Sequence, residues 1–208
     1  MINNKLYGKA ELITKMMIIN LLWFFSVLLG FVIFSFFPAN AALMITVSKL
    51  QKENPSYLEL INIFIKMFKR DWLKMMIFQV GTIVFLIILV SNFKFIESYN
   101  EYDIVKYLLK PMMILIALLG SVIMLNSFVI NCLIECDLKE LLLNSLKYAF
   151  IFPTHTIIMG LLLASLVLII LYLPGLIPVL SLNIYCYFAL KIMNKGISIV
   201  NKQKELIS

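Results

Sequence analysis

Long runs of apolar residues dominate the chain, and short segments between them carry most of its charge. The first run, residues 16–37, contains no charged residue, and as a helix it would exceed the ~30 Å hydrocarbon core of a bilayer. It is also too long for the ~7–15-residue apolar core of a cleavable signal peptide. Four further apolar runs are bounded by polar or turn-forming residues. The pattern predicts an all-α membrane bundle with about five transmembrane helices, at residues 16–37, 75–90, 112–134, 157–173 and 176–193.

A segment with a different pattern precedes the second predicted span. Residues 56–72 place apolar side chains at helical spacing and basic side chains elsewhere, which is typical of an amphipathic helix at a membrane surface. Ser56 and Glu59 have the spacing of a capping box, in which each side chain pairs with a free amide near the helix start. The basic side chains of this segment are Lys66, Lys69 and Arg70. We expect them to contact anionic lipid headgroups or, as an alternative, a partner protein.

Residues 137–151 repeat this design on a smaller scale. Asp137 and Glu140 lie three positions apart at the start, an apolar stripe follows, and Pro153 ends the predicted helix. A span, a capped amphipathic helix and another span therefore occur twice. We hypothesise an internal repeat with a fifth helix added, within a single membrane domain that covers residues 1–208.

Positive charge is distributed unevenly among the segments between the predicted spans. The segment between the second and third spans balances three lysines with acidic residues, whereas the other long segments are strongly basic. The positive-inside rule places both amphipathic helices and the C-terminus in the cytoplasm. The basic residues between the first two spans, which contribute most to this assignment, are Lys49, Lys52, Lys66, Lys69, Arg70 and Lys74.

The N-terminus conflicts with this assignment if the chain makes five simple crossings. Lys5, Lys9 and Lys15 would then lie outside, although the charge rule favours the cytoplasm. Pro38 suggests an alternative, because proline interrupts helices. We favour an arrangement in which residues 38–50 re-enter the membrane or fold back as a short helix, so that both ends of the first apolar region face the cytoplasm.

The composition agrees with a membrane protein and limits its chemistry. Of 208 residues, 62% are hydrophobic and 14% charged, and the mean hydropathy is +1.00, which exceeds what a soluble domain of this size can bury. The net charge is +7, and the basic residues flank the apolar runs. This distribution indicates contact with lipid headgroups and not nucleic-acid binding. The sequence has one histidine, His155, and three cysteines that lie in or beside apolar segments, Cys132, Cys136 and Cys186. We therefore expect no bound metal, no cofactor and no histidine-based catalysis.

Several polar side chains lie inside or at the ends of the predicted spans, where an unpaired polar group is costly. One interpretation is a polar seam that lines a substrate path. The other, which we favour, is that these side chains clamp neighbouring helices by hydrogen bonds and that Glu135 lies at the cytoplasmic interface. The residues of this candidate seam are Asn20, Gln79, Asn126, Asn131, Glu135 and Asn183.

Four short motifs occur in the order found in a known family: NLLW at 20–23, FPANAAL at 37–43, FKRDWLK at 68–74 and LPGLIP at 173–178. In these motifs the chain resembles the YesL-like family of bacterial membrane proteins, also called domain of unknown function 624. The resemblance implies a small multi-span protein of the bacterial cell membrane, often encoded beside carbohydrate ABC transporters, with no established activity. Phe37 departs from the family pattern, in which Gly or Thr often precedes the Pro-Ala pair, so we expect a local difference in the turn there.

Three functional interpretations remain. The first is a non-enzymatic accessory or scaffold protein linked to carbohydrate uptake or utilisation, with carbohydrate ABC transporter subunits as partners; the carbohydrate link is implied by the resemblance alone. The alternative is a small transporter or channel that uses the polar seam, although the spans contain almost no charged residues. An intramembrane enzyme is the weakest interpretation, because the sequence has no nucleophile and base pair, acidic metal cluster or Gly-rich phosphate loop.

Overall fold

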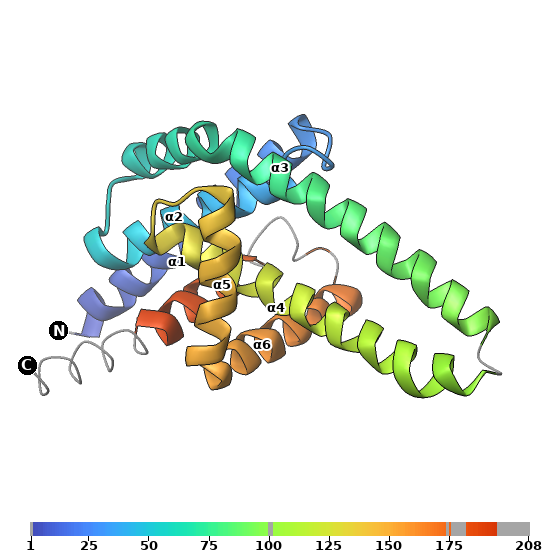
Figure 1. Ribbon diagram of the computed structural model, residues 1–208. Helices are drawn as coiled ribbons and strands as arrows, with labels where there is room; N and C mark the ends of the chain where they lie inside the picture. Colours follow the sequence, from blue (N-terminus) through green and yellow to red (C-terminus); the bar gives the residue numbers. More distant parts are fainter. Residues whose placement is uncertain (1, 100–101, 174, 176–181, 195–208) are drawn as a thin grey trace, which may run out of the picture.

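The computed structural model describes residues 2–99, 102–173, 175 and 182–194, and these form an all-helical bundle (Figure 1). Four helices in this part of the chain are long and apolar enough to cross a membrane: Ala10–Leu29, Tyr57–Ser98, Tyr107–Leu133 and Pro153–Tyr172. The prediction of an all-α, multi-pass membrane protein is therefore confirmed. The elements in chain order are α1 (Ile2–Leu29), α2 (Phe36–Glu53), α3 (Tyr57–Ser98), η1 (Val105–Leu109), α4 (Lys110–Leu133), α5 (Leu138–Ile151) and α6 (Pro153–Tyr172).

The predicted spans in the second half of the chain agree with these elements. Span 112–134 corresponds to α4, and span 157–173 corresponds to α6, which begins four residues earlier than expected. Of the fifth predicted span, 176–193, the first part (176–181) lies outside the described residues. Residues 182–194 are helical, which agrees with the remainder of that prediction.

The first predicted span, 16–37, overlaps the candidate span Ala10–Leu29, but its end is wrong, because α1 ends at Leu29 and the chain turns back. Pro38 prevents a helix from continuing through this region, since it lacks an amide hydrogen and its ring clashes with the carbonyl four residues earlier. Phe31 and Val32 instead take left-handed backbone angles, with φ of 54° and 46°. The apolar composition of the run concealed a turn within it.

Gly30 allows the chain to double back immediately after α1. A Cβ atom at this position would lie 2.3 Å from the Cβ of Ser35, so a larger residue does not fit without moving the turn. The Ser35 hydroxyl donates a hydrogen bond to the carbonyl of Val27, at 3.1 Å, and ties the returning chain to α1. The turn is therefore specified by local close contacts.

Hydrogen bonds along their length show that α1 and α2 form an antiparallel hairpin. The middle of α1 pairs with the residue after α2, and the end of α1 pairs with the residue before α2. Both outer ends of the hairpin consequently lie at the same end of the bundle, and the fold-back expected for residues 38–50 is confirmed. The paired residues are Lys15 with Asn54, Trp23 with Asn40, and Val27 with Ser35.

A side chain from α3 satisfies backbone groups at the tip of this hairpin. The Gln79 amide nitrogen donates to the carbonyl of Val32 at 3.0 Å, and its oxygen accepts from the amide of Phe37 at 2.9 Å. Both backbone groups belong to the break between α1 and α2, where the helical hydrogen bonds are interrupted. In an apolar environment such groups are costly unless they find a partner, so Gln79 stabilises the break.

The centre of the bundle is α2, which contacts α1, α3 and α4. Ala39, Ala41 and Ala42 are fully buried, and small side chains let neighbouring helices approach closely. Phe37, the departure from the family pattern, packs against Phe78 and Phe128, with ring centroids 5.3 and 5.1 Å away. Its ring joins α2 to α3 and α4.

The amphipathic helix 56–72 and the span 75–90 were predicted as separate elements, but they form one continuous helix, α3. The capping box at its start is confirmed, since the amide of Ser56 donates to Glu59 at 2.8 Å and the amide of Glu59 donates to the Ser56 hydroxyl at 3.4 Å. Its 42 residues correspond to about 63 Å, twice the hydrocarbon thickness, so α3 extends well outside the membrane. Figure 1 shows its second half running beside α4 away from the other helices.

In the second half of the chain the amphipathic helix and the span that follows it are separate helices, whereas in the first half they form the single helix α3. The predicted helix 137–151 is present as α5, with Asp137 as its N-cap residue, but the Asp137 side chain makes no capping hydrogen bond. α5 ends at Ile151, and Pro153 begins α6 as a separate helix. The internal repeat therefore stays a hypothesis, because its two proposed copies differ at this point.

The position of Gln79 along α3 indicates how far the hairpin reaches into the membrane. Gln79 lies about 7 Å along the helix axis beyond Lys74, whereas Lys94 lies about 22 Å beyond Gln79. Charged residues mark the two ends of the apolar part of α3, so the hairpin tip is closer to the end at which α1 begins. We predict that α1 and α2 enter and leave the membrane on the same side without crossing it.

Cysteine labelling tests this topology. In intact cells, a membrane-impermeant maleimide should label Tyr102→Cys, in the connection after α3, and should label Tyr7→Cys only after permeabilisation. Phe31→Cys, at the hairpin tip, should remain unlabelled in both conditions, because the tip lies in hydrocarbon. Labelling of Phe31→Cys from outside intact cells would show that the hairpin crosses. The background must lack the three native thiols, at Cys132, Cys136 and Cys186.

Replacing Gln79 with leucine tests the role of its side chain at the hairpin tip. The variant keeps a similar size but leaves the Val32 carbonyl and the Phe37 amide without this partner, so we expect a loss of about 1–3 kcal/mol in unfolding free energy. The measurement is SDS-induced unfolding in mixed micelles. Thr82→Val is a matched control, because the Thr82 hydroxyl bonds only within its own helix, to Phe78; an equal loss in both variants would contradict the assignment.

Candidate functional site

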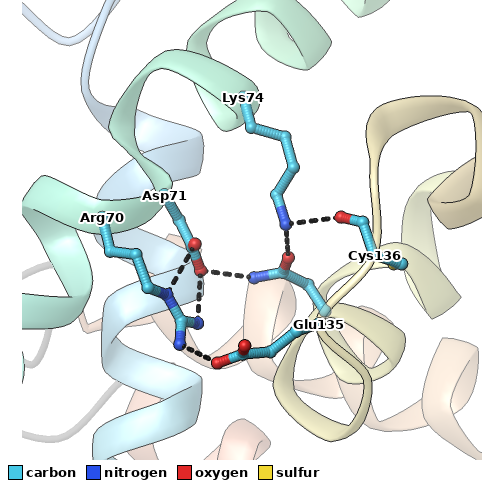
Figure 2. Close-up of polar contacts among 6 residues, drawn as sticks. Arg70, Asp71, Lys74, Glu135 and Cys136 are labelled. Atoms are coloured by element: carbon cyan, nitrogen blue, oxygen red, sulfur yellow. Dashed lines mark hydrogen bonds and ion pairs between the residues drawn. The ribbon is translucent and has the colours of Figure 1, made fainter.

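Charged and polar side chains gather where α3 meets the C-terminal end of α4 and the loop that follows it (Figure 2). This loop is extended, since Ile134 leaves the helix with φ −130° and ψ 124°. It brings two residues from beyond α4 back towards α3. We call the group the charged cluster; its members are Arg70, Asp71, Lys74, Asn131, Glu135 and Cys136.

Asp71 is the buried carboxylate of the charged cluster, with 5% of its surface exposed. Its two oxygens accept hydrogen bonds from Arg70, from Nε at 2.9 Å and from Nη2 at 3.0 Å. The side-chain amide of Asn131 adds a third hydrogen bond at 3.0 Å. A buried carboxylate is tolerated only when it is paired in this way, so Asp71 connects α3 firmly to α4.

Lys74 makes the second connection between these helices. Its ammonium group donates to the side-chain oxygen of Asn131 and to the backbone carbonyl of Cys136, the latter at 3.1 Å. Figure 2 shows the lysine reaching across to the loop between α4 and α5. The side-chain amide of Asn131 therefore bridges two residues of α3: its nitrogen donates to Asp71, and its oxygen accepts from Lys74.

Arg70 and Glu135 form an ion pair at the surface of the charged cluster. The Arg70 Nη1 atom donates to a Glu135 carboxylate oxygen, while the Glu135 side chain is 83% exposed. An ion pair with such exposure is screened by water and contributes less than about 1 kcal/mol. Arg70 is therefore bound mainly by the buried Asp71, and Glu135 adds a peripheral contact.

A cavity of about 380 Å³ lies beside the charged cluster, and two further carboxylates, Asp137 and Glu140, line it. The cavity is bordered by four carboxylates and two cations in all, a formal charge of −2. Cys136 also lines it, but burial raises the pKa of this thiol, so it stays protonated and unreactive near neutral pH.

The charged cluster is suited to holding helices together. Its cations are already paired with carboxylates or amide oxygens, and its thiol is not activated. Across residues 2–99, 102–173, 175 and 182–194, no three His, Cys, Asp or Glu side chains are grouped so as to hold a metal ion. The arrangement fixes the end of α4, and hence the start of α5, against α3.

The structure distributes the residues of the candidate seam over separate contacts. Asn131 and Glu135 join the charged cluster, and Gln79 binds the hairpin tip. Asn126 of α4 donates to the Thr156 hydroxyl of α6 at 3.3 Å. The other two are buried: Asn20 lies in α1, and Asn183, in helix 182–194, donates to the carbonyl of Met16 in α1. These are hydrogen bonds between segments, which is the kind of contact that clamping requires.

The predicted basic contact residues separate into two groups. Lys66 and Lys69 are exposed on α3, whereas Arg70 is engaged by Asp71 and Glu135. The sequence reasoning missed Asp71 and Lys74 as site residues. A signal for Asp71 was present, since it is a lone acidic residue inside the basic run FKRDWLK.

His155 lies at the start of α6, beside the end of α5. Its ring packs edge-on against Phe152 with centroids 5.3 Å apart, and Tyr148 packs against the same phenylalanine at 5.0 Å. Burial raises the pKa of Tyr148 to about 12. The three rings fill the junction between the two helices.

A pair of alanine variants separates the buried connection from the exposed one. Asp71→Ala leaves Arg70 and Asn131 without their shared acceptor, so we expect a loss of about 1–3 kcal/mol in unfolding free energy. Glu135→Ala should cost less than about 1 kcal/mol, because it removes only an exposed ion pair. SDS-induced unfolding in mixed micelles measures both values. Equal losses would mean that Asp71 does not carry the connection.

Comparison with known proteins agrees with this description. Residues 16–93, which cover the second half of α1, all of α2 and nearly all of α3, match the family described as "Protein of unknown function, DUF624". The chain is 26% identical over 196 residues to "Uncharacterized protein YesV" of Bacillus subtilis (strain 168), covering 92% of this chain and 89% of that protein. No solved structure matches the chain. The resemblance predicted from the motifs is confirmed: residues 16–93 match the DUF624 family of proteins of unknown function, and the chain is a distant homologue of YesV.

Proposed function

We propose that the chain is a non-enzymatic accessory or scaffold protein of the bacterial cell membrane that docks a partner of a carbohydrate uptake system. The observation that carries the proposal is the use of polar side chains inside the bundle. Gln79, Asn126, Asn131 and Asn183 make hydrogen bonds that hold one segment against another, and Glu135 makes an ion pair with Arg70 of α3. Such a bundle is built for rigidity.

The carbohydrate part of the proposal comes from the family resemblance. Members of the family are often encoded beside carbohydrate ABC transporters, so transporter subunits are the partners that we propose. The matched relative, YesV, is described as uncharacterized and adds no activity. The physical part of the proposal, a rigid membrane bundle with an exposed basic surface, is independent of this link.

The docking surface that we propose is the exposed basic part of α3, defined by Lys66 and Lys69. Neither lysine has an ion-pair partner among the described residues. The charged cluster lies directly beside them and fixes this part of α3 to α4 and α5, so the surface is presented in a constant orientation. An acidic surface on a transporter subunit complements it.

The alternative of a small transporter or channel has no observation in its favour. A hydrated solute needs several polar groups along one path, and the polar groups here lie at separate helix contacts. The cavity beside the charged cluster lies at the end of α4 and not at the middle of the spans.

Co-purification tests the proposal. A tagged copy is isolated in mild detergent from its native cell grown on plant polysaccharide, and the proteins that accompany it are identified by mass spectrometry. We expect transporter subunits in amounts comparable to the bait. Recovery of the protein without them would contradict the accessory role.

Charge reversal identifies the docking surface in the same experiment. Lys66→Glu with Lys69→Glu should reduce the recovered subunits roughly tenfold, because two attractive contacts become repulsive. Lys94→Glu with Lys110→Glu is the matched control, since it makes the same charge change near the far end of α3 and the start of α4. Equal losses in both double variants would contradict docking through this surface, and binding to anionic vesicles measures any separate contribution of lipid headgroups.

A further inference from the structure

A second, larger cavity of about 740 Å³ lies between α2, α4, α6 and the helix 182–194. Each of these helices contributes residues to its walls, among them Met44, Phe128, Leu163 and Tyr185. Its volume falls within the range of about 300–1,000 Å³ that is typical of small-molecule sites. Close packing is the rule inside proteins, so a space of this size requires an occupant.

The depth of the cavity in the membrane indicates what surrounds it. Its wall on α4 extends from Ser121 to Phe128, and its wall on α6 extends from Gly160 to Leu168. Both stretches include or adjoin the middle of candidate membrane spans, Tyr107–Leu133 and Pro153–Tyr172. The cavity therefore lies at the level of the hydrocarbon core.

The lining of this cavity is chemically suited to an apolar occupant. No charged residue contributes to it. Of its polar side chains, Asn40 already accepts a hydrogen bond from the Trp23 indole at 2.8 Å, and the Ser121 hydroxyl donates to the Ala117 carbonyl at 2.8 Å. A hydrated sugar or an ion finds too few free partners in such a site. Apolar cavities in proteins stay dry and bind apolar molecules.

We propose that this cavity binds an acyl chain of a phospholipid from the surrounding bilayer. The chain replaces the van der Waals contacts that an empty cavity would forgo, and it makes α2, the centre of the bundle, touch lipid through a defined site. This inference goes beyond the proposed accessory function and does not depend on a transporter partner.

Native mass spectrometry of the protein purified in mild detergent tests the proposal. We expect a retained adduct with the mass of one phospholipid. Ala164→Trp combined with Ser121→Phe fills the cavity from opposite walls and should lower the adduct roughly tenfold. The control, Ser165→Trp with Leu118→Phe, introduces the same two aromatic side chains at neighbouring residues that do not line the cavity, and should keep the adduct. No adduct on the unaltered protein, or equal adducts on both double variants, would overturn the proposal.

A second measurement uses the unaltered sequence and so does not depend on whether the filled variant folds. The protein is placed in nanodiscs that contain phosphatidylglycerol with a diazirine in the middle of one acyl chain, and cross-linked residues are mapped after irradiation. Phe128 and Leu163 line the cavity and are partly exposed, so a chain in the cavity lies against them. Cross-linking at Phe128 and Leu163 is expected; cross-linking confined to outward-facing residues such as Leu161 would overturn the proposal.

Discussion

Inside a hydrocarbon environment, every backbone amide or carbonyl that leaves a helix must be satisfied by the protein itself, and the arrangement of the first three helices depends on this constraint. The chain breaks between α1 and α2, and the freed groups at Val32 and Phe37 are bound by Gln79 of α3. α3 must therefore lie directly against the hairpin tip. Lys74 and Asp71, about one and two turns earlier on α3, then position α4 through Asn131.

Much of the fold follows from local sequence, and the exceptions have a common cause. Length and apolar composition were sufficient to predict α4 and α6, and the Ser56–Glu59 spacing predicted the start of α3. Hydropathy was uninformative within residues 16–37, because a turn made of Phe, Val and Ile is as apolar as the helices beside it. The positive charges of Lys66, Lys69 and Arg70 suggested a boundary before residue 75, but a continuous helix simply carries them beyond the membrane.

Part of the candidate site was predictable from the sequence, but Asp71, Lys74 and the pairing among its residues were not. Asn131 and Glu135 were recognised because polar groups near a span are costly, and the same reasoning selected Gln79 and Asn126. Which polar side chain meets which depends on contacts between segments far apart in sequence, such as Asp71 with Asn131, and periodicity within one helix contains no such information. The candidate residues therefore belong to several separate contacts between helices.

The helices are distributed unevenly along the direction of the spans. The α1–α2 hairpin, the first part of α3 and all of α5 lie towards one end of the bundle, and Figure 1 shows α3 and α4 extending alone towards the other. A hairpin that enters one leaflet without crossing displaces lipid area in that leaflet alone. We therefore expect the energy of the protein in a bilayer to depend on local curvature as well as on lipid composition.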